Sequence, residues 1–68
     1  MKGRELFRVI TRLGYSVDRQ TGSHRRMVHD SRPPLTFAFH DGDDLPPGLV
    51  RRILISTGLT DEEIRELL

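Results

Sequence analysis

The chain lacks cysteine and tryptophan, and it has no long hydrophobic run. None of its 68 residues is Cys or Trp, which excludes disulfide bonds, zinc sites built on thiolates and a thiol nucleophile. No stretch approaches the ~20 apolar residues that a membrane-spanning helix needs, and no hydrophobic segment after the N-terminal Met-Lys resembles a signal peptide. We therefore expect a cytoplasmic protein with no membrane partner.

The chain is also short and poor in aromatic residues. Its length corresponds to one domain, residues 1–68, close to the smallest size at which a hydrophobic core holds a fold alone. One Tyr and three Phe are present, and we expect the Phe side chains to form core. Too few aromatic residues remain for a platform on which RNA bases stack.

A formal net charge of +1 conceals an asymmetry between the two halves of the chain. Residues 1–34 hold eight basic and three acidic side chains, a net charge of +5. Residues 35–68 hold three basic and seven acidic side chains, a net charge of −4. A basic half of this kind attracts phosphate groups or the acidic surface of a partner protein.

Hydrophobic periodicity and turn residues predict an α-β-β-β-α order. A helical stripe followed by a glycine predicts a helix from about Gly3 to Leu13. Alternation predicts three strands: one from about residue 15 to a turn at residues 20–22, one over residues 23–29, and one around residues 35–40. The order implies an α+β two-layer sandwich, in which helices cover one face of a three-stranded antiparallel sheet and leave the other face open.

Two helical segments are predicted in the acidic half. A helix begins at Pro46-Pro47, where the missing amide hydrogens are not needed, and ends at Gly58. Thr60 and Glu63 have the spacing of a capping box that begins a short last helix. We expect Ile64, Leu67 and Leu68 to dock this helix.

The alternation in the strands places two of the three histidines. If Leu35, Phe37 and Phe39 face the helices, His40 lies on the open face. Burying Met27 in the second strand sends His24 and Arg26 to that same face, whereas the opposite phase would bury an unpaired arginine. A histidine can exchange a proton with a ribose 2′-hydroxyl or with the leaving oxygen of a phosphodiester, and arginines stabilise the charge on phosphate. An ordinary surface histidine is the alternative.

A metal site or another cofactor is not expected. His24 and His29 are an odd number of residues apart in one strand, so they point to opposite faces, and no thiolate is available. Asp41, Asp43 and Asp44 lack the spacing and the terminal glutamate of a calcium-binding EF-hand, so this segment is expected to be a solvated turn.

The first helix carries a row of arginines. Arg4, Arg8 and Arg12 follow one another at i+4, a spacing at which like charges destabilise a helix slightly, and Arg4 also opposes the helix dipole. Contact with phosphate or with an acidic partner would explain this arrangement. A solvated helix face is an equally good interpretation.

Several short segments resemble the HicA family of type II toxins. They are Leu13-Gly14-Tyr15, the segment 19–24 that ends in Gly-Ser-His, Phe37-Ala38-Phe39-His40, the segment 44–48, Ile53-Leu54 and the segment 58–60. In two positions the chain departs from the family pattern, with Ala38 in place of the usual proline and Leu49 where threonine is common. The resemblance implies a double-stranded-RNA-binding-domain-like fold, an mRNA endoribonuclease that inhibits translation, a HicB-like antitoxin partner and His24 as the catalytic residue.

These observations lead to one main hypothesis and two alternatives. The main hypothesis is a metal-independent endoribonuclease toxin in which His24 is the general base or acid. The residues expected to bind the RNA substrate are Arg4, Arg8, Arg12, Ser23, Arg25, Arg26 and His40. The alternatives are a non-catalytic RNA-binding module and a protein-interaction domain on the same fold.

Overall fold

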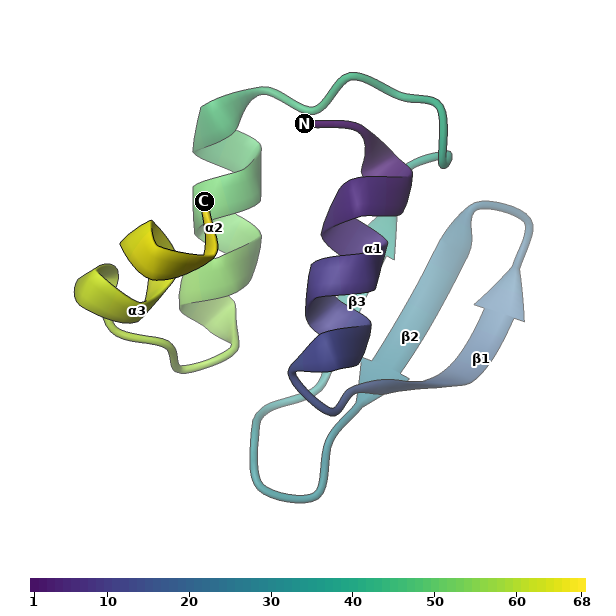
Figure 1. Cartoon of the computed structure of the whole chain (residues 1–68). Helices are drawn as coiled ribbons and strands as arrows, with labels where there is room; N and C mark the ends of the chain where they lie inside the picture. Colours follow the sequence, from purple (N-terminus) through teal and green to yellow (C-terminus); the bar gives the residue numbers. More distant parts are fainter.

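Three helices and one three-stranded sheet make up the computed structural model, which describes residues 1–68 (Figure 1). The elements in chain order are α1 (Gly3–Arg12), β1 (Ser16–Thr21), β2 (His24–Val28), β3 (Leu35–Ala38), α2 (Pro47–Ser56) and α3 (Asp61–Leu67). The predicted α-β-β-β-α order and the α+β class are thus confirmed. None of the three helices has the length and apolar character needed to cross a membrane.

The sheet is an antiparallel meander in the order β1-β2-β3. Thr21 pairs with His24, so the hairpin loop consists of Gly22 and Ser23 rather than residues 20–22. Gly22 has φ +60°, and hairpin loops of two residues favour glycine at the first position when its φ is positive. Ser23 therefore lies in the turn that directly precedes His24, not in the strand.

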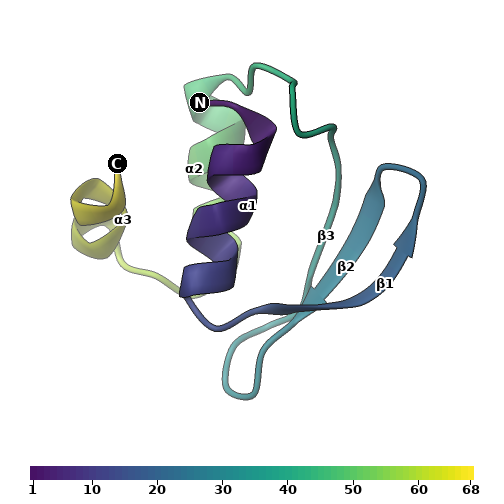
Figure 2. The ribbon, with the colours of Figure 1, turned by 45° about the vertical axis from the view of Figure 1, so that its right-hand side comes forward.

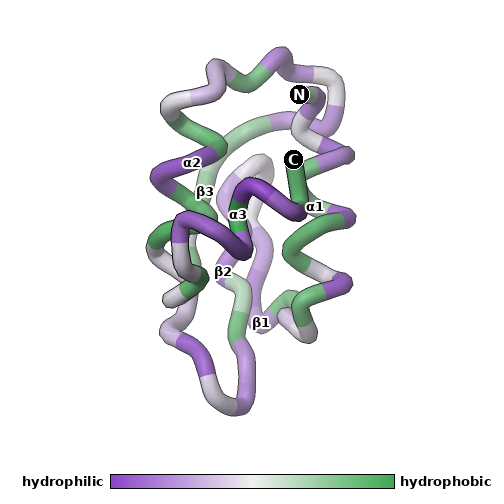
Figure 3. The backbone as a smooth tube through the Cα atoms, turned by 60° about the vertical axis from the view of Figure 1, so that its left-hand side comes forward, coloured by the Kyte–Doolittle hydropathy of each residue, from purple (hydrophilic) through white to green (hydrophobic).

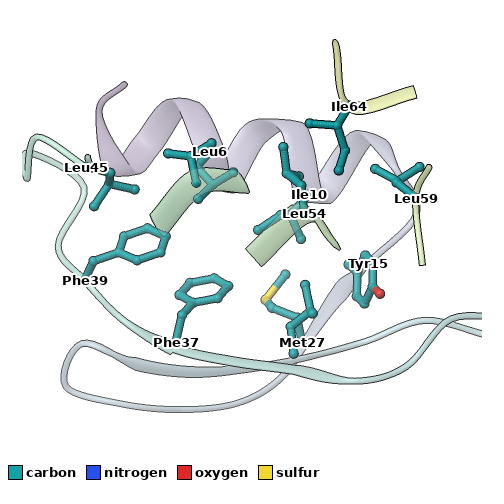
Figure 4. Packing of buried hydrophobic residues seen from close by; sticks show 12 residues of the cluster. Leu6, Ile10, Tyr15, Met27, Phe37, Phe39, Leu45, Leu54, Leu59 and Ile64 are labelled. Carbon is teal, nitrogen blue, oxygen red and sulfur yellow. The ribbon is translucent and has the colours of Figure 1, made fainter. Parts of the chain in front are cut away.

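The core lies between the sheet and the two longer helices (Figure 4). Leu6 and Ile10 of α1 and Leu54 of α2 are fully buried against Met27 of β2, which confirms the predicted inward direction of Met27. Leu35, Phe37 and Phe39 are also buried, as the alternation predicted.

The hairpin of β1 and β2 extends beyond the layer of helices (Figure 2). Every residue of β1 is exposed, and Val17 remains exposed although it pairs with the buried Met27. Both faces of the sheet are thus accessible at this edge, and the open face is accessible along its whole length.

The third strand is shorter than expected and leads into a loop that covers the start of α1. It ends at Ala38, and the backbone N–H of His40 donates to the Asp43 carboxylate over 2.8 Å. The N–H groups of Gly3 and Arg4, which have no partner within α1, donate to the carbonyl oxygens of Asp43 and Asp41. Residues 41–44 are exposed, as expected for a solvated turn, and the carbonyl oxygens of Asp41 and Asp43 also complete the N-terminus of α1.

The last helix has the predicted capping box but not the predicted docking residues. The Thr60 hydroxyl accepts from the Glu63 N–H, and the Glu63 carboxylate accepts from the Thr60 N–H. Ile64 is buried, whereas Leu67 and Leu68 are 39% and 62% exposed. The expectation for these two leucines was wrong because only Ile64 enters the core. Leu67 lines a shallow hollow with Leu59, and Leu68 lines another with Leu45 and Val50.

Candidate active site

The open face of the sheet carries polar side chains around His24. Two cross-strand rows share this face: Thr21, His24 and Ala38 in one row, and Arg19, Arg26 and Thr36 in the other. Residues directly opposite each other on neighbouring strands have Cβ atoms about 4.5–5.5 Å apart, and residues two apart along a strand are separated by about 6–7 Å. A group the size of a phosphate can therefore contact His24 and Arg26 at the same time.

An irregularity in β1 brings Arg19 to this face. Val17 pairs with Met27 and Arg19 pairs with Arg26, so Asp18 is the extra residue of a β-bulge. Simple alternation from Val17, which lies on the helix side with Met27, would place Arg19 on the helix side as well. The extra residue reverses the alternation and puts Arg19 directly opposite Arg26.

These side chains surround a polar cavity of about 220 Å³. Its lining contains no hydrophobic residue and consists of Arg19, Thr21, His24, Arg25, Arg26 and Thr36. A larger groove of about 350 Å³ lies between β3 and α2, and most of its lining is hydrophobic, with no histidine. Proton transfer needs a titratable group near its operating pH, so the smaller cavity with His24 is the candidate active site.

The cavity combines positive charge with one nearby carboxylate. The Arg26 Nε donates to Asp18 Oδ2 over 3.2 Å, and both side chains are about half exposed. Arg19 takes part in none of the four ion pairs of the protein. The cavity thus offers guanidinium donors beside an exposed imidazole, which is an arrangement suited to a phosphodiester.

A comparison with protein families identifies the chain. A family model described as the HicA toxin of bacterial toxin-antitoxin systems matches residues 3–59, which include α1, the whole sheet and α2. The chain belongs to the HicA toxin family. No curated protein and no solved structure matches the chain. The resemblance seen in the sequence is therefore confirmed at the level of the family.

Arg25 of this HicA toxin is held on the helix side of the sheet. Its Nη2 donates to Asp41 Oδ1 over 3.1 Å, and its guanidinium lies over the Phe7 ring at 4.6 Å from the ring centroid. The side chain is 14% exposed, and its Nε and Nη1 are buried without a hydrogen-bond partner. Arg25 therefore ties β2 to α1 and to the loop after β3, while Arg26 points to the open face.

The other two histidines lie apart from the cavity. His29 is partly buried, with Nε2 at 2.8 Å from the Leu13 carbonyl oxygen, and its Nδ1 accepts from the Ser31 N–H. Both ring nitrogens thus hold loops together. His40 is exposed in the loop beyond β3, and neither His40 nor Ser23 lines the cavity. No three His, Asp or Glu side chains lie close enough together to hold a metal ion.

The arginine row of α1 points away from the core. Leu6 and Ile10 face the core, and at 100° per residue Arg4, Arg8 and Arg12 lie on the opposite side of the helix. All three are exposed and belong to none of the ion pairs. Figure 3 shows the corresponding alternation of hydrophilic and hydrophobic residues along α1. The row is therefore exposed on α1 and takes no part in the lining of the cavity.

Sequence reasoning missed three residues of the cavity: Arg19, Thr21 and Thr36. The alternation of β3 places Thr36 on the open face, where it pairs with Arg26, but a threonine alone does not indicate a binding site. Arg19 and Thr21 depend on the bulge. Strict alternation counted back from the hairpin loop places Arg19 on the open face of the sheet. Strict alternation counted forward from Val17 places it on the helix side. That conflict between the two counts was the available signal of the bulge.

Proposed function

We propose that this HicA toxin is an endoribonuclease that cleaves mRNA at the cavity on the open face, with His24 as the general acid or base. The single observation that carries the proposal is the position of His24 beside Arg19 and Arg26 in the lining of the cavity. Membership of the HicA family supports it, because a toxin of a toxin-antitoxin system needs a cellular target.

The chemistry requires two proton transfers, and a histidine can perform either of them at neutral pH. His24 accepts the proton of a ribose 2′-hydroxyl, and the 2′-oxygen forms a bond to the adjacent phosphorus. The bond from phosphorus to the 5′-oxygen breaks, and that oxygen takes a proton from water, which leaves a cyclic phosphate and a 5′-hydroxyl. In the reverse assignment, water accepts the proton of the 2′-hydroxyl, and protonated His24 supplies a proton to the 5′-oxygen. Both steps proceed without a metal ion.

The charges on the phosphate need donors that are already in place. Arg26 and Arg19 face the cavity beside His24, where their guanidinium groups stabilise the additional negative charge of the transition state. The α1 row of Arg4, Arg8 and Arg12 contacts more distant phosphates of a long RNA. Each phosphate contact that is removed makes the slope of log K against log salt less negative by about 0.7 for single-stranded RNA.

The partner of the toxin is a cognate HicB-like antitoxin. We propose that it covers the open face, because α1 and α2 lie on the other side of the sheet (Figure 1) and His24 is exposed. A single partner surface over this face blocks access of RNA to the cavity.

Cleavage of mRNA by the purified protein in the presence of EDTA tests the proposal. We expect cleavage by the wild type and a rate lower by about two to four orders of magnitude for His24→Ala, which is the usual contribution of general acid-base catalysis. Because His24 is exposed, circular dichroism should show an unchanged fold. His40→Ala provides the comparison: an equally large loss there would contradict the assignment to His24. Salt-sensitive RNA binding without any cleavage would favour a non-catalytic RNA-binding module.

A further inference from the structure

The bulge in β1 creates an arrangement that is unfavourable without an anion. Arg19 and Arg26 are directly opposite each other on neighbouring strands, and like charges in this position destabilise a sheet. The same bulge supplies Asp18, whose carboxylate is 3.2 Å from the Arg26 Nε. One carboxylate thus accompanies two guanidinium groups at the edge of the cavity.

The carboxylate and an RNA phosphate compete for the same donors. Guanidinium groups bind carboxylate and phosphate oxygens with the same planar geometry. The side chains of Arg26 and Asp18 are 49% and 53% exposed, and an ion pair at such a position changes an equilibrium constant by no more than about fivefold. A phosphate that also contacts Arg19 displaces the Asp18 carboxylate without a large penalty.

We propose that Arg19 and Arg26 form a phosphate clamp beside His24, and that Asp18 is a built-in competitor that occupies Arg26 until an RNA phosphate displaces it. This inference rests on the proposed function, because the ligand is an RNA phosphodiester. Arg19, Arg26 and Asp18 set the affinity for that phosphodiester. In the absence of RNA, Asp18 reduces the repulsion between the two arginines. In the presence of RNA, Asp18 competes for Arg26 and lowers the affinity of the clamp for the RNA phosphate.

A binding experiment that does not depend on cleavage tests this inference. The probe is a 2′-O-methylated oligoribonucleotide, whose dissociation constant is measured by fluorescence anisotropy at fixed salt. Asp18→Asn keeps the shape of the side chain and removes its charge. Asp30→Asn is the matched control, because Asp30 is an exposed acid of the same basic half and takes part in no ion pair. Both variants raise the net charge by one.

The expected result is that Asp18→Asn binds the probe up to about fivefold more tightly than the wild type, and more tightly than Asp30→Asn does. In an Arg26→Gln background, the same Asp18→Asn change should produce no gain, because the competed donor is absent. An equal gain in the two single variants would overturn the inference, and so would a gain that persists without Arg26.

A titration with inorganic phosphate adds a readout at the arginines themselves. We expect the Nε–H signals of Arg19 and Arg26 in nuclear magnetic resonance spectra to shift together, while that of Arg65 on α3 does not. Equal shifts of all three would contradict the clamp. These binding outcomes are independent of the cleavage test: loss of cleavage in His24→Ala with no effect of Asp18→Asn refutes the clamp alone, and the opposite pattern refutes the catalytic proposal alone.

Discussion

Replacing Gly3 by Ala tests how closely α1 is fitted to the loop that covers its N-terminus. A Cβ atom at Gly3 would overlap the backbone oxygen of His40 and come within 2.8 Å of Cδ1 of Phe39. Backbone atoms cannot turn aside as the end of a flexible side chain does, so α1 or the segment of Phe39 and His40 must move. Such overpacking costs about 1–3 kcal/mol.

The movement also weakens hydrogen bonds at the same place. The N–H groups of Gly3 and Arg4 donate to loop carbonyl oxygens at 2.9 and 3.0 Å, and each bond contributes about 0.5–1.5 kcal/mol. The two losses add to about 2–6 kcal/mol, and replacing a helical glycine returns about 0.5–1 kcal/mol. The net loss of about 1–5 kcal/mol compares with a free energy of unfolding of about 3–10 kcal/mol expected for a chain of this length. The Gly3→Ala variant should therefore melt at least about 4 °C below the wild type.

Thermal and urea unfolding followed by circular dichroism measure this effect. Gly48→Ala is the control, because Gly48 lies in α2 and a Cβ atom added there would have no neighbouring atom within 4 Å. This substitution should raise the free energy of unfolding by about 0.5–1 kcal/mol. A melting temperature of Gly3→Ala within about 2 °C of the wild type would refute the reasoning, since it would mean that the loop yields freely.

Three further predictions concern side chains with defined contacts. Arg25→Met removes two buried donors that have no partner, so the free energy of unfolding should change by no more than about 1.5 kcal/mol, and RNA affinity measured by anisotropy should fall less than in Arg26→Met. Hydrogen bonds from Thr60 lower the pKa of Glu63 below its ordinary 4.5. The resulting stabilisation is therefore present above pH 4.5 and is lost as the pH falls through the lower pKa of the folded state. Urea titrations should show a higher free energy of unfolding for the wild type than for Glu63→Gln at pH 7, and no such difference at acid pH. Burial raises the pKa of Tyr15 above 10.0. The neutral phenol therefore contributes fully to the free energy of unfolding below pH 10.0, and this contribution is lost as the pH rises through the higher pKa of the folded state. Stability measurements between pH 9 and 11 should show no such loss for Tyr15→Phe.

The elements and the inward face of β2 could be predicted because they depend on local patterns. A helical stripe, an alternating strand and a capping box each lie within a few residues of sequence. Met27 was placed correctly because the opposite phase would have buried Arg26. Local rules of this kind determine which residues face the core, and in this protein they also bring His24 to the open face.

The remaining features depend on contacts between distant segments. Arg25 lies between Phe7 and Asp41, and no local pattern pairs residues so far apart in the chain. The third strand ends early because the chain turns to complete the start of α1. The position of Arg19 depends on how β1 pairs with β2, since one extra residue changes the face of every residue that follows.

The bulge also determines which changes in chain length the site tolerates. Deleting Asp18 leaves Val17 opposite Met27 and Arg19 opposite Arg26, because only the unpaired residue is lost. Deleting Gln20 instead gives a regular ladder in which Asp18 faces Arg26 and Arg19 turns to the helix side. The two deletions thus have opposite outcomes. The first keeps both arginines of the phosphate clamp and removes Asp18, whereas the second keeps Asp18 opposite Arg26 and removes Arg19 from the clamp.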